Sequence, residues 1–165
     1  MYKITRGKLI TNAYLAGIID GEGSIFICRI HNKRSGNIWY RLELSCGMTS
    51  PEAIGLLRTF NPRLKQYIYI KGRKKGYKDV YQWKATGETG LRVIESLIPY
   101  MLVKKRQAKL AVEFQKWRSS LPNTGKKRTP NIIKKFEIYY QRMRALNGKR
   151  PQRLSEETAK ADAIV

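Results

Sequence analysis

Three kinds of residue are scarce in this chain of 165 residues, and each scarcity excludes a class of protein or site. Cys28 and Cys46 are the only cysteines, too few for a disulfide framework or a structural zinc site. His31 is the only histidine, so no histidine-rich metal site is expected. We therefore expect reduced, structural cysteines in an intracellular protein, located either in an organelle or in a prokaryotic cytoplasm.

Acidic residues are the third scarcity. Asp and Glu total 12 against 34 Lys and Arg, which gives a formal net charge of +22 and a sequence pI of about 10.3. Such an excess repels the compact chain from itself unless a polyanion neutralises it. A membrane surface is one polyanion, but no apolar run approaches the roughly 18 residues of a spanning helix and no signal peptide opens the chain. Nucleic acid is therefore the expected partner.

Hydrophobic residues make up 42% of the chain, enough for one domain with a real core. Their periodicity predicts an α+β fold, in which helices and strands follow the order αββαββα before further helices. The expected helices are 11–19, 50–60, 87–120 with a break near Pro99, 130–148 and 155–165, and the expected strands are 24–30, 39–49, 66–71 and 79–85.

The second expected strand has one apolar and one polar side. Its apolar side carries Leu42, Leu44, Cys46 and Met48, and its polar side carries Arg41, Glu43, Ser45 and Gly47. Five basic runs border the strands, namely HNKR, KGRKKGYK, VKKRQAK, GKKR and GKRPQR. A single run of this kind is usually a solvated surface. Five around one four-stranded antiparallel sheet predict a basic saddle over a duplex, in which strand side chains reach base edges.

The stretch TNAYLAGIIDGEGSIFI, residues 11–27, places two acids, Asp20 and Glu22, between a helix and a strand. A calcium loop is excluded, because its sixth position would be Ile25 rather than Gly and its twelfth His31 rather than Glu. An ordinary surface turn remains the simple alternative.

The same helix has an unusual side. Ala13, Gly17 and Gly21 fall four residues apart, so one ridge has almost no side chains and another backbone could approach it closely. If two copies of the helix met there, the acids of both copies would lie close together. Paired acids bridged by divalent metal ions are common in phosphodiester hydrolysis. The stretch thus predicts a dimer interface with a metal centre at its end.

The residues LAGIIDGEG, 15–23, resemble the LAGLIDADG motif of homing endonucleases, and the order αββαββα is similar to the core fold of that family. A single copy of the motif resembles the homodimeric branch, whose subunits join through the motif helices over a long near-palindromic DNA site. The segment ALNGKRPQRLSEETAKA resembles the closing segment of algal chloroplast intron enzymes of this branch. The resemblance covers most of the chain. It implies one LAGLIDADG endonuclease domain, 1–165, with a motif helix at 11–23, a core at 24–118 and C-terminal helices at 119–165.

The resemblance also assigns roles to particular residues. It implies that Glu22 is a metal ligand in each subunit, with the backbone carbonyl of Gly21 as the neighbouring ligand. It implies that Lys104 borders the hydrolytic water and the scissile phosphate, where its charge would stabilise the transition state. Ser50 occupies the place of the family's water-ordering Gln, although Ser50 is also suited to cap a helix. Asp20 belongs to the motif but is expected to be structural.

Strand parity in the resemblance directs one set of side chains toward DNA, and a C-terminal set toward the phosphates. The strand set is Phe26, Cys28, Ile30, Arg41, Glu43, Ser45, Gly47, Tyr67, Tyr69, Lys71, Val80, Gln82 and Lys84, and the phosphate set is Lys149, Arg150 and Arg153. A register error of one residue would turn the assignments of any strand toward the core.

The function that the resemblance implies is intron homing: a homodimer with Mg²⁺ or another divalent metal hydrolyses both strands of a specific site on double-stranded DNA by in-line attack of water. Three alternatives stay open, namely an intron RNA-splicing maturase on the same fold, a DNA-binding regulator without catalysis, and a ribosome-associated basic protein. The regulator is kept open by Ser50 and by Ile54, which stands where the family usually has Arg. Glu22 and Lys104 together favour the enzyme.

Overall fold

The computed structural model describes residues 11–31, 36, 38–58, 67–69, 78–122 and 128–148, the strand at 67–69 by its backbone alone. The helices in these residues are α1 (Asn12–Glu22), α2 (Pro51–Leu57), α3 (Gly87–Leu97), the 3₁₀ turn η2 (Ile98–Tyr100), α4 (Lys105–Ser120) and α5 (Pro130–Leu146). The strands are β1 (Gly23–His31), β2 (Ile38–Met48), β3 (Tyr67–Tyr69) and β4 (Val80–Thr86).

One antiparallel sheet orders its strands β1-β2-β4-β3. The strands β1, β2 and β4 are long, with 9, 11 and 7 residues, while β3 contributes 3 residues at the edge. The register pairs Gly23 with Cys46 and Ser45 with Lys84, which fixes the side of the sheet that each side chain occupies. The α+β class and the order αββαββα that the sequence predicts are both present.

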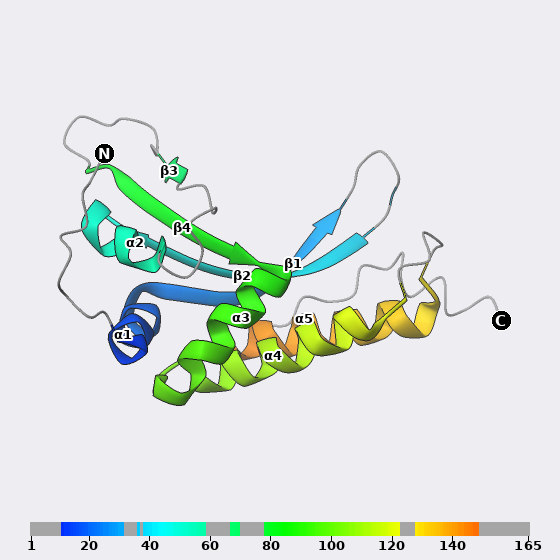
Figure 1. Cartoon of the computed structure of the whole chain (residues 1–165). Helices are drawn as coiled ribbons and strands as arrows, with labels where there is room; N and C mark the ends of the chain where they lie inside the picture. The colour runs from blue at the N-terminus through cyan, green and yellow to red at the C-terminus, as the bar shows by residue number, and fades with distance from the viewer. Residues whose placement is uncertain are drawn as a thin grey trace.

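The helices α1, α3, α4 and α5 lie on one side of the sheet, and none of these four helices lies on its opposite face (Figure 1). The sheet contributes alternate residues to the core between them, including Ile25, Leu42, Leu44 and Trp83, each at most 1% exposed. The helices contribute buried side chains at helical spacing: Leu15, Ala16 and Ile19 from α1, Val93, Ile94 and Leu97 from α3, Ala108, Ala111 and Phe114 from α4, and Phe136, Tyr139 and Met143 from α5.

Helix α1 passes directly into β1. Thr11 caps the start of the helix, since its side chain accepts a hydrogen bond from the amide of Tyr14 at 3.3 Å. The helix continues beyond its expected end near residue 19 and closes on Glu22. A Cβ at Gly23 would lie 2.6 Å from the carbonyl oxygen of Ile19, so any other residue there would force the helix and the strand apart.

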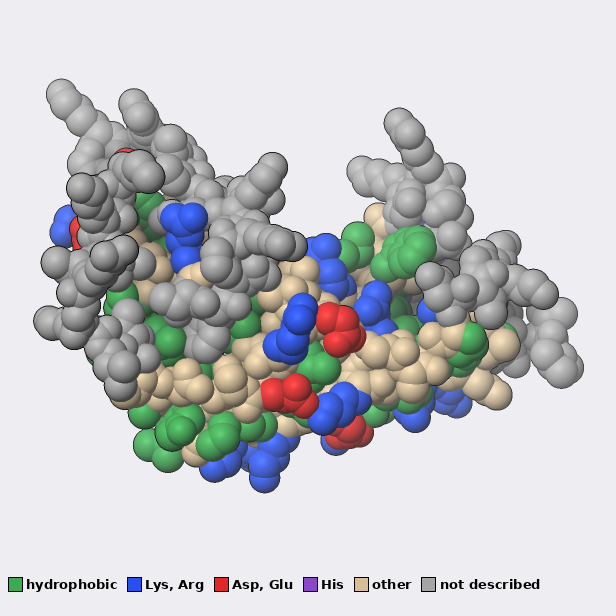
Figure 2. All heavy atoms as spheres, in the orientation of Figure 1, with side chains coloured by type: hydrophobic (Ala, Val, Ile, Leu, Met, Phe, Trp, Pro, Cys, Tyr) green, Lys and Arg blue, Asp and Glu red, His purple; other side chains and the backbone are tan. Residues whose placement is uncertain are grey.

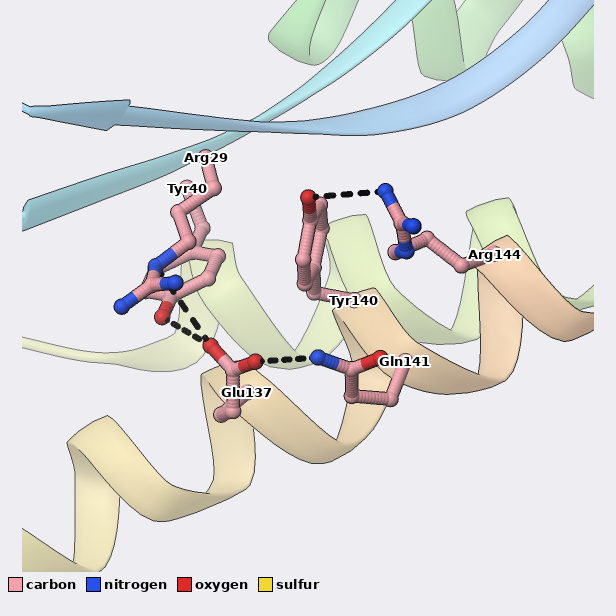
Figure 3. Close-up of polar contacts among 6 residues, drawn as sticks. All are labelled: Arg29, Tyr40, Glu137, Tyr140, Gln141 and Arg144. Atoms are coloured by element: carbon pink, nitrogen blue, oxygen red, sulfur yellow. Dashed lines mark hydrogen bonds and ion pairs between the residues drawn. The ribbon is translucent and has the colours of Figure 1, made fainter. Parts of the chain in front are cut away.

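A buried carboxylate joins α5 to the sheet (Figure 3). Glu137 is 9% exposed and accepts hydrogen bonds from Tyr40 Oη at 2.5 Å and from Gln141 Nε2 at 2.6 Å. Arg29 Nε lies 3.7 Å from the same carboxylate, and the ring of Tyr40 stacks on that of Phe136 with centroids 5.2 Å apart. These contacts satisfy a buried charge and hold α5 against β1 and β2.

Several details of the expected fold are confirmed. Helix α3 ends at Leu97, η2 contains Pro99, and α4 begins at Lys105, so the helical segment is interrupted where Pro99 predicts. The expected strand 66–71 is a strand over its central residues 67–69. The expected last helix, 155–165, lies outside the described residues. None of the helices in the described ranges is both long and apolar enough to cross a membrane.

Candidate functional site

Asp20, near the end of α1, lies against the start of α4. Its carboxylate accepts three backbone N–H groups, from Leu102 at 2.7 Å, Val103 at 3.2 Å and Lys104 at 2.9 Å. Burial would raise the pKa of this carboxyl, but the three amides and the charge of Lys104 outweigh it and hold the pKa below its usual value. Asp20 therefore bridges α1 and α4, which agrees with its expected structural role.

Glu22 is the last residue of α1, and its surroundings differ from those of Asp20. Both Glu22 and Gly21 are exposed, and among the described residues the Glu22 carboxylate has no hydrogen-bond or ion-pair partner. No group of three or more His, Cys, Asp and Glu side chains in the described ranges could hold a metal ion. One chain thus offers a single free carboxylate here, next to backbone carbonyls, and oxygen donors of this kind are those that Mg²⁺ prefers.

Lys104 brings a positive charge to the same place. It precedes α4, and its ammonium donates a hydrogen bond to the backbone carbonyl of Asp20, next to Gly21. The charges of Glu22 and Lys104 both affect the pKa of the buried Cys46 thiol. Burial and then the negative charge of Glu22 raise the pKa of this thiol to about 11, while the charge of Lys104 opposes the rise. The charges of Glu22 and Lys104 therefore act on the same thiol, which the sheet register places opposite Gly23.

The hydroxyl of Ser50 is engaged as a helix cap. It accepts a hydrogen bond from the amide of Ala53 at 3.2 Å and donates one to Glu52 Oε2 at 2.9 Å. It begins α2 with Pro51 in the first turn, the arrangement that the sequence predicts. A catalytic role of Ser50 stays a prediction. A catalytic water bound by Ser50 would compete with the Ala53 amide and the Glu52 carboxylate for the hydroxyl.

One side of α1 is open, while its other side is buried in the core. Ala13, Gly17 and Gly21 are all exposed. A Cβ added at Gly17 or Gly21 would meet nothing within 4 Å. Glycine in a helix interior is destabilising by roughly 0.5–1 kcal/mol relative to alanine. Packing among the described residues therefore gives no reason for glycine at these two positions.

Apolar side chains border this ridge. Tyr14 on α1 is 57% exposed, and Tyr100, Leu102 and Val103, between α3 and α4, are 51%, 86% and 73% exposed. Figure 2 shows hydrophobic side chains gathered at the lower left, below the sheet. Sequence analysis missed the last three residues, although the apolar run YMLV ahead of the basic KKR was an available signal. The α1 surface is defined here as Ala13, Tyr14, Gly17, Gly21, Tyr100, Leu102 and Val103.

The side of the sheet opposite these four helices, called the open face, carries the strand residues that were expected to point toward DNA. The register places on it Phe26, Cys28 and Ile30 of β1, Arg41, Glu43, Ser45 and Gly47 of β2, and Val80, Gln82 and Lys84 of β4. The backbone of β3 pairs Tyr67 with Gln82 and Tyr69 with Val80. Lys71, Lys149, Arg150 and Arg153 lie outside the described residues. The shared face is confirmed for β1, β2 and β4, and contact with DNA stays a prediction.

Exposure varies within the open face. Arg41 is exposed, but Glu43 and Ser45 are only 4% and 8% exposed, so the expectation that Glu43 itself meets a ligand is not supported by its burial. Trp39 was missed by the sequence analysis. It pairs with Ile30 on the open face and is 56% exposed. Its alternation with Arg41 along β2 was the signal that could have found it.

Solved structures share this fold over most of the chain. The homing endonuclease I-CvuI, in complex with uncleaved DNA in the presence of Mg, aligns with a TM-score of 0.67 and 21% identity over 91% of this chain and 90% of its own. An archaeal intron-encoded homing endonuclease complexed with DNA aligns with a TM-score of 0.68 and 16% identity over 92% of this chain and 94% of its own. The LAGLIDADG meganuclease I-AabMI, bound to uncleaved DNA, aligns with a TM-score of 0.62 and 20% identity over 94% of this chain and 50% of its own.

No family model and no curated protein matches this sequence. The structural alignments, at 16% to 21% identity, establish the architecture: the chain has the fold of LAGLIDADG homing endonucleases. That result agrees with the resemblance of the motif LAGIIDGEG to the motif that names the family.

Proposed function

We propose that this protein is an intron-encoded LAGLIDADG homing endonuclease, which makes metal-dependent double-strand breaks in a long near-palindromic DNA site as a homodimer. One observation carries the proposal. In a chain with this fold, the exposed residue Glu22 ends the helix that carries the glycine ridge, and the ammonium of Lys104 is held at the same end of the helix by the backbone carbonyl of Asp20.

The α1 surface supports a homodimer. A second copy of α1 packed on Gly17 and Gly21 would make use of the missing side chains and cover Tyr14, Leu102 and Val103. A two-fold contact along this ridge would bring the Glu22 carboxylates of both copies near the axis, one for each DNA strand. The alignment of this chain to half of the I-AabMI chain agrees with a site that two copies of the fold complete.

The residues at the end of α1 fit a hard divalent cation. Glu22 offers carboxylate oxygens and Gly21 a backbone carbonyl, and both residues are exposed. When bound there, Mg²⁺ would lower the pKa of a water molecule and neutralise charge on the phosphate.

Lys104 supplies a fixed positive charge to the same site. The Asp20 carboxylate accepts a hydrogen bond from the Lys104 amide, and the Asp20 backbone carbonyl accepts one from the Lys104 ammonium. These two bonds fix Lys104 relative to α1. The ammonium then stabilises the negative charge that develops on the scissile phosphate. Water attacks in line with the leaving oxygen, and the protein forms no covalent intermediate.

The open face and the net charge of +22 support binding to duplex DNA. Arg41, Gln82 and Lys84 place hydrogen-bond donors on one side of the sheet, where they can reach base edges in a major groove. Phosphate contacts by the many Lys and Arg residues would supply most of the affinity. Binding is therefore expected to weaken steeply as salt rises.

The decisive experiment is cleavage of a randomised duplex library by the purified protein in Mg²⁺, followed by sequencing of the cut ends. Parallel reactions use Ca²⁺ in place of Mg²⁺, and the variant Glu22→Gln in Mg²⁺. We expect the protein to cut a near-palindromic site and the variant to bind that site without cutting it. The control Glu95→Gln removes a carboxylate of the helical layer, paired with Lys116 at 2.8 Å, and should cut normally.

Other outcomes select the alternatives. Specific binding by the wild-type protein without cutting would favour the catalytically inactive regulator. Neither binding nor cutting of any duplex would contradict the proposal and direct attention to intron RNA and the maturase.

A further inference from the structure

A carboxylate is buried on the open face, among the positive charges that would meet DNA. The side chain of Glu43, in the middle of β2, is 5% exposed. Its Oε1 lies 2.9 Å from Lys84 Nζ, and its Oε2 lies 3.2 Å from Arg41 Nη2. The thiol of Cys28 donates a hydrogen bond to Oε2 at 3.5 Å. The three partners come from β4, β2 and β1, so Glu43 links three neighbouring strands on one face.

These contacts keep the carboxylate charged. Burial raises the pKa of Glu43, but the hydrogen bond and charge of Lys84, the hydrogen bond from Cys28 and the charge of Arg41 outweigh it and hold the pKa below its usual value. Burial and the neighbouring Glu43 raise the pKa of the Cys28 thiol to about 11. The thiol therefore keeps its proton at neutral pH and remains a donor to Glu43.

The two cations are presented to the outside, and the carboxylate between them is hidden. The side chains of Arg41 and Lys84 are 45% and 36% exposed, so a ligand on the open face would meet them before Glu43. Each of them uses a donor on Glu43, and among the described residues its other N–H groups have no further partner and can meet a ligand.

The energetic cost of a buried carboxylate on this face indicates that Glu43 has a function there. A buried ion cluster is often no more stabilising than apolar side chains of similar size. A negative charge on a face that binds DNA also weakens the attraction of that face for phosphates. Glu43 offsets one of the two positive charges beside it, but it also holds both cations in one geometry, which reduces the freedom they lose on binding.

We propose that Glu43 is a positioning residue, which holds Arg41 and Lys84 in the geometry that reads guanine in the major groove of each half-site. The inference rests on the proposed function and names part of its substrate. Contacts of Arg or Lys with guanine O6 and N7 are the commonest base-specific contacts. Cations released from Glu43 would turn toward phosphates, which fix position but carry no sequence information.

The test is selection of bound duplexes from a randomised library in Ca²⁺, with sequencing of the selected pool, for the wild-type protein and Glu43→Gln. In the wild-type pool we expect G·C pairs at symmetric positions of the two half-sites. In the variant pool, preference at those positions should fall about 10-fold, with the other positions unchanged. Binding of the variant to random DNA should tighten, with a salt dependence steeper by about one phosphate contact per subunit.

Matched variants make the result decisive. Arg41→Gln and Lys84→Gln should lose preference at the same base pairs as Glu43→Gln, and they decide the matter if Glu43→Gln fails to unfold cooperatively in urea. Glu95→Gln removes a carboxylate of an ion pair on the helical layer and should leave the whole profile unchanged.

Two results would overturn the inference while leaving the proposed function intact. One is a Glu43→Gln profile identical to that of the wild-type protein. The other is loss of preference by Arg41→Gln and Lys84→Gln at base pairs that are not G·C. A wild-type protein that selects no duplex at all would instead contradict the proposed function itself.

Discussion

Asp20 and Glu22 are carboxylates two positions apart on the last turn of α1, and their environments differ. Asp20 accepts three backbone amides from residues 102–104, and its pKa lies below the usual value. Glu22 is exposed and has no partner among the described residues. The difference comes from helix geometry, because residues two apart point to different sides of a helix. Only the Asp20 side faces the segment before α4.

The comparison separates two tasks within one short motif. The acid with partners joins α1 to α4 and fixes Lys104, so its contribution is to the fold and to the position of a charge. Glu22, which has no partner in the described part of the chain, contributes little to folding and is available to a ligand. If this division holds, substitutions at the two positions should affect different measurements.

The largest effect is expected for Glu22→Gln. Loss of the Glu22 carboxylate at the end of α1 should reduce the rate of DNA cleavage by at least about 10³-fold. The free energy of unfolding should change by less than about 0.5 kcal/mol, since the side chain is exposed. Single-turnover cleavage and urea unfolding measure the two quantities. Cleavage retained within a few-fold would end the proposed metal role of Glu22.

The next effect is expected for Gly17→Leu, on the open ridge of the same helix. A Cβ there meets nothing within 4 Å among the described residues, so the monomer should be as stable as the wild type or more so by roughly 0.5–1 kcal/mol. Dimerisation should weaken at least about 100-fold, because the side chain occupies the space of a second helix. Sedimentation equilibrium measures the dimer.

The matched control for this substitution is Gly55→Leu. Gly55 is also helical, and a Cβ there also meets nothing within 4 Å, but it lies on α2, outside the α1 surface. Equal dimerisation of the wild type and Gly17→Leu would remove the α1 ridge from the interface.

Asp20→Ala should act on stability. Removal of a carboxylate that accepts three amides is expected to lower the free energy of unfolding by about 2 kcal/mol at pH 7. The pKa of Asp20 in the folded protein lies below its usual value, so its stabilisation is full above about pH 4 and is lost as pH falls through the folded-state pKa. Urea unfolding from pH 7 to pH 2.5 should show the wild type and the variant converging in acid. A constant difference across that range would assign the effect to something other than this charge.

The smallest effect is expected for Ser50→Ala. Loss of the cap on α2 should lower the free energy of unfolding by about 1 kcal/mol. Cleavage should change by less than about 3-fold, since the hydroxyl is already occupied by Ala53 and Glu52. A fall of about 100-fold in cleavage, with the fold intact, would instead place Ser50 in the catalytic site.

Much of the fold could be predicted because it follows from local rules. The alternation of Leu42 and Leu44 with Arg41 and Glu43 gave the correct side for residues 41–48 of β2, since strand side chains alternate strictly. The interruption of the helical segment at Pro99 followed from the chemistry of proline. The cap at Ser50 followed from its place directly before Pro51.

The features that sequence analysis missed depend on contacts between distant parts of the chain. Parity put Glu43 on the correct face, but only the approach of Lys84 from β4 and Cys28 from β1 buries it. The amide partners of Asp20 lie more than 80 positions away along the chain. Sequence analysis assigned no role to Leu102 and Val103, and their exposure depends on the segment before α4, whose amides bind Asp20 of α1.

Gly23 has a further consequence for a dimer built on α1. A Cβ at this position would lie 2.6 Å from the carbonyl oxygen of Ile19, so the motif helix and the first strand follow each other without a spacer. A helix that passes into a strand without a connecting loop has no hinge at that point. Two copies of the protein joined through α1 would therefore behave as one rigid unit. The length of DNA between the two half-sites would then be fixed by the distance between two helix axes. A single base pair inserted at the centre of the DNA site lengthens it by roughly 3.4 Å, and the DNA would have to bend or twist to compensate. The protein would then discriminate against a wrong spacing of the half-sites as strictly as against a wrong base sequence.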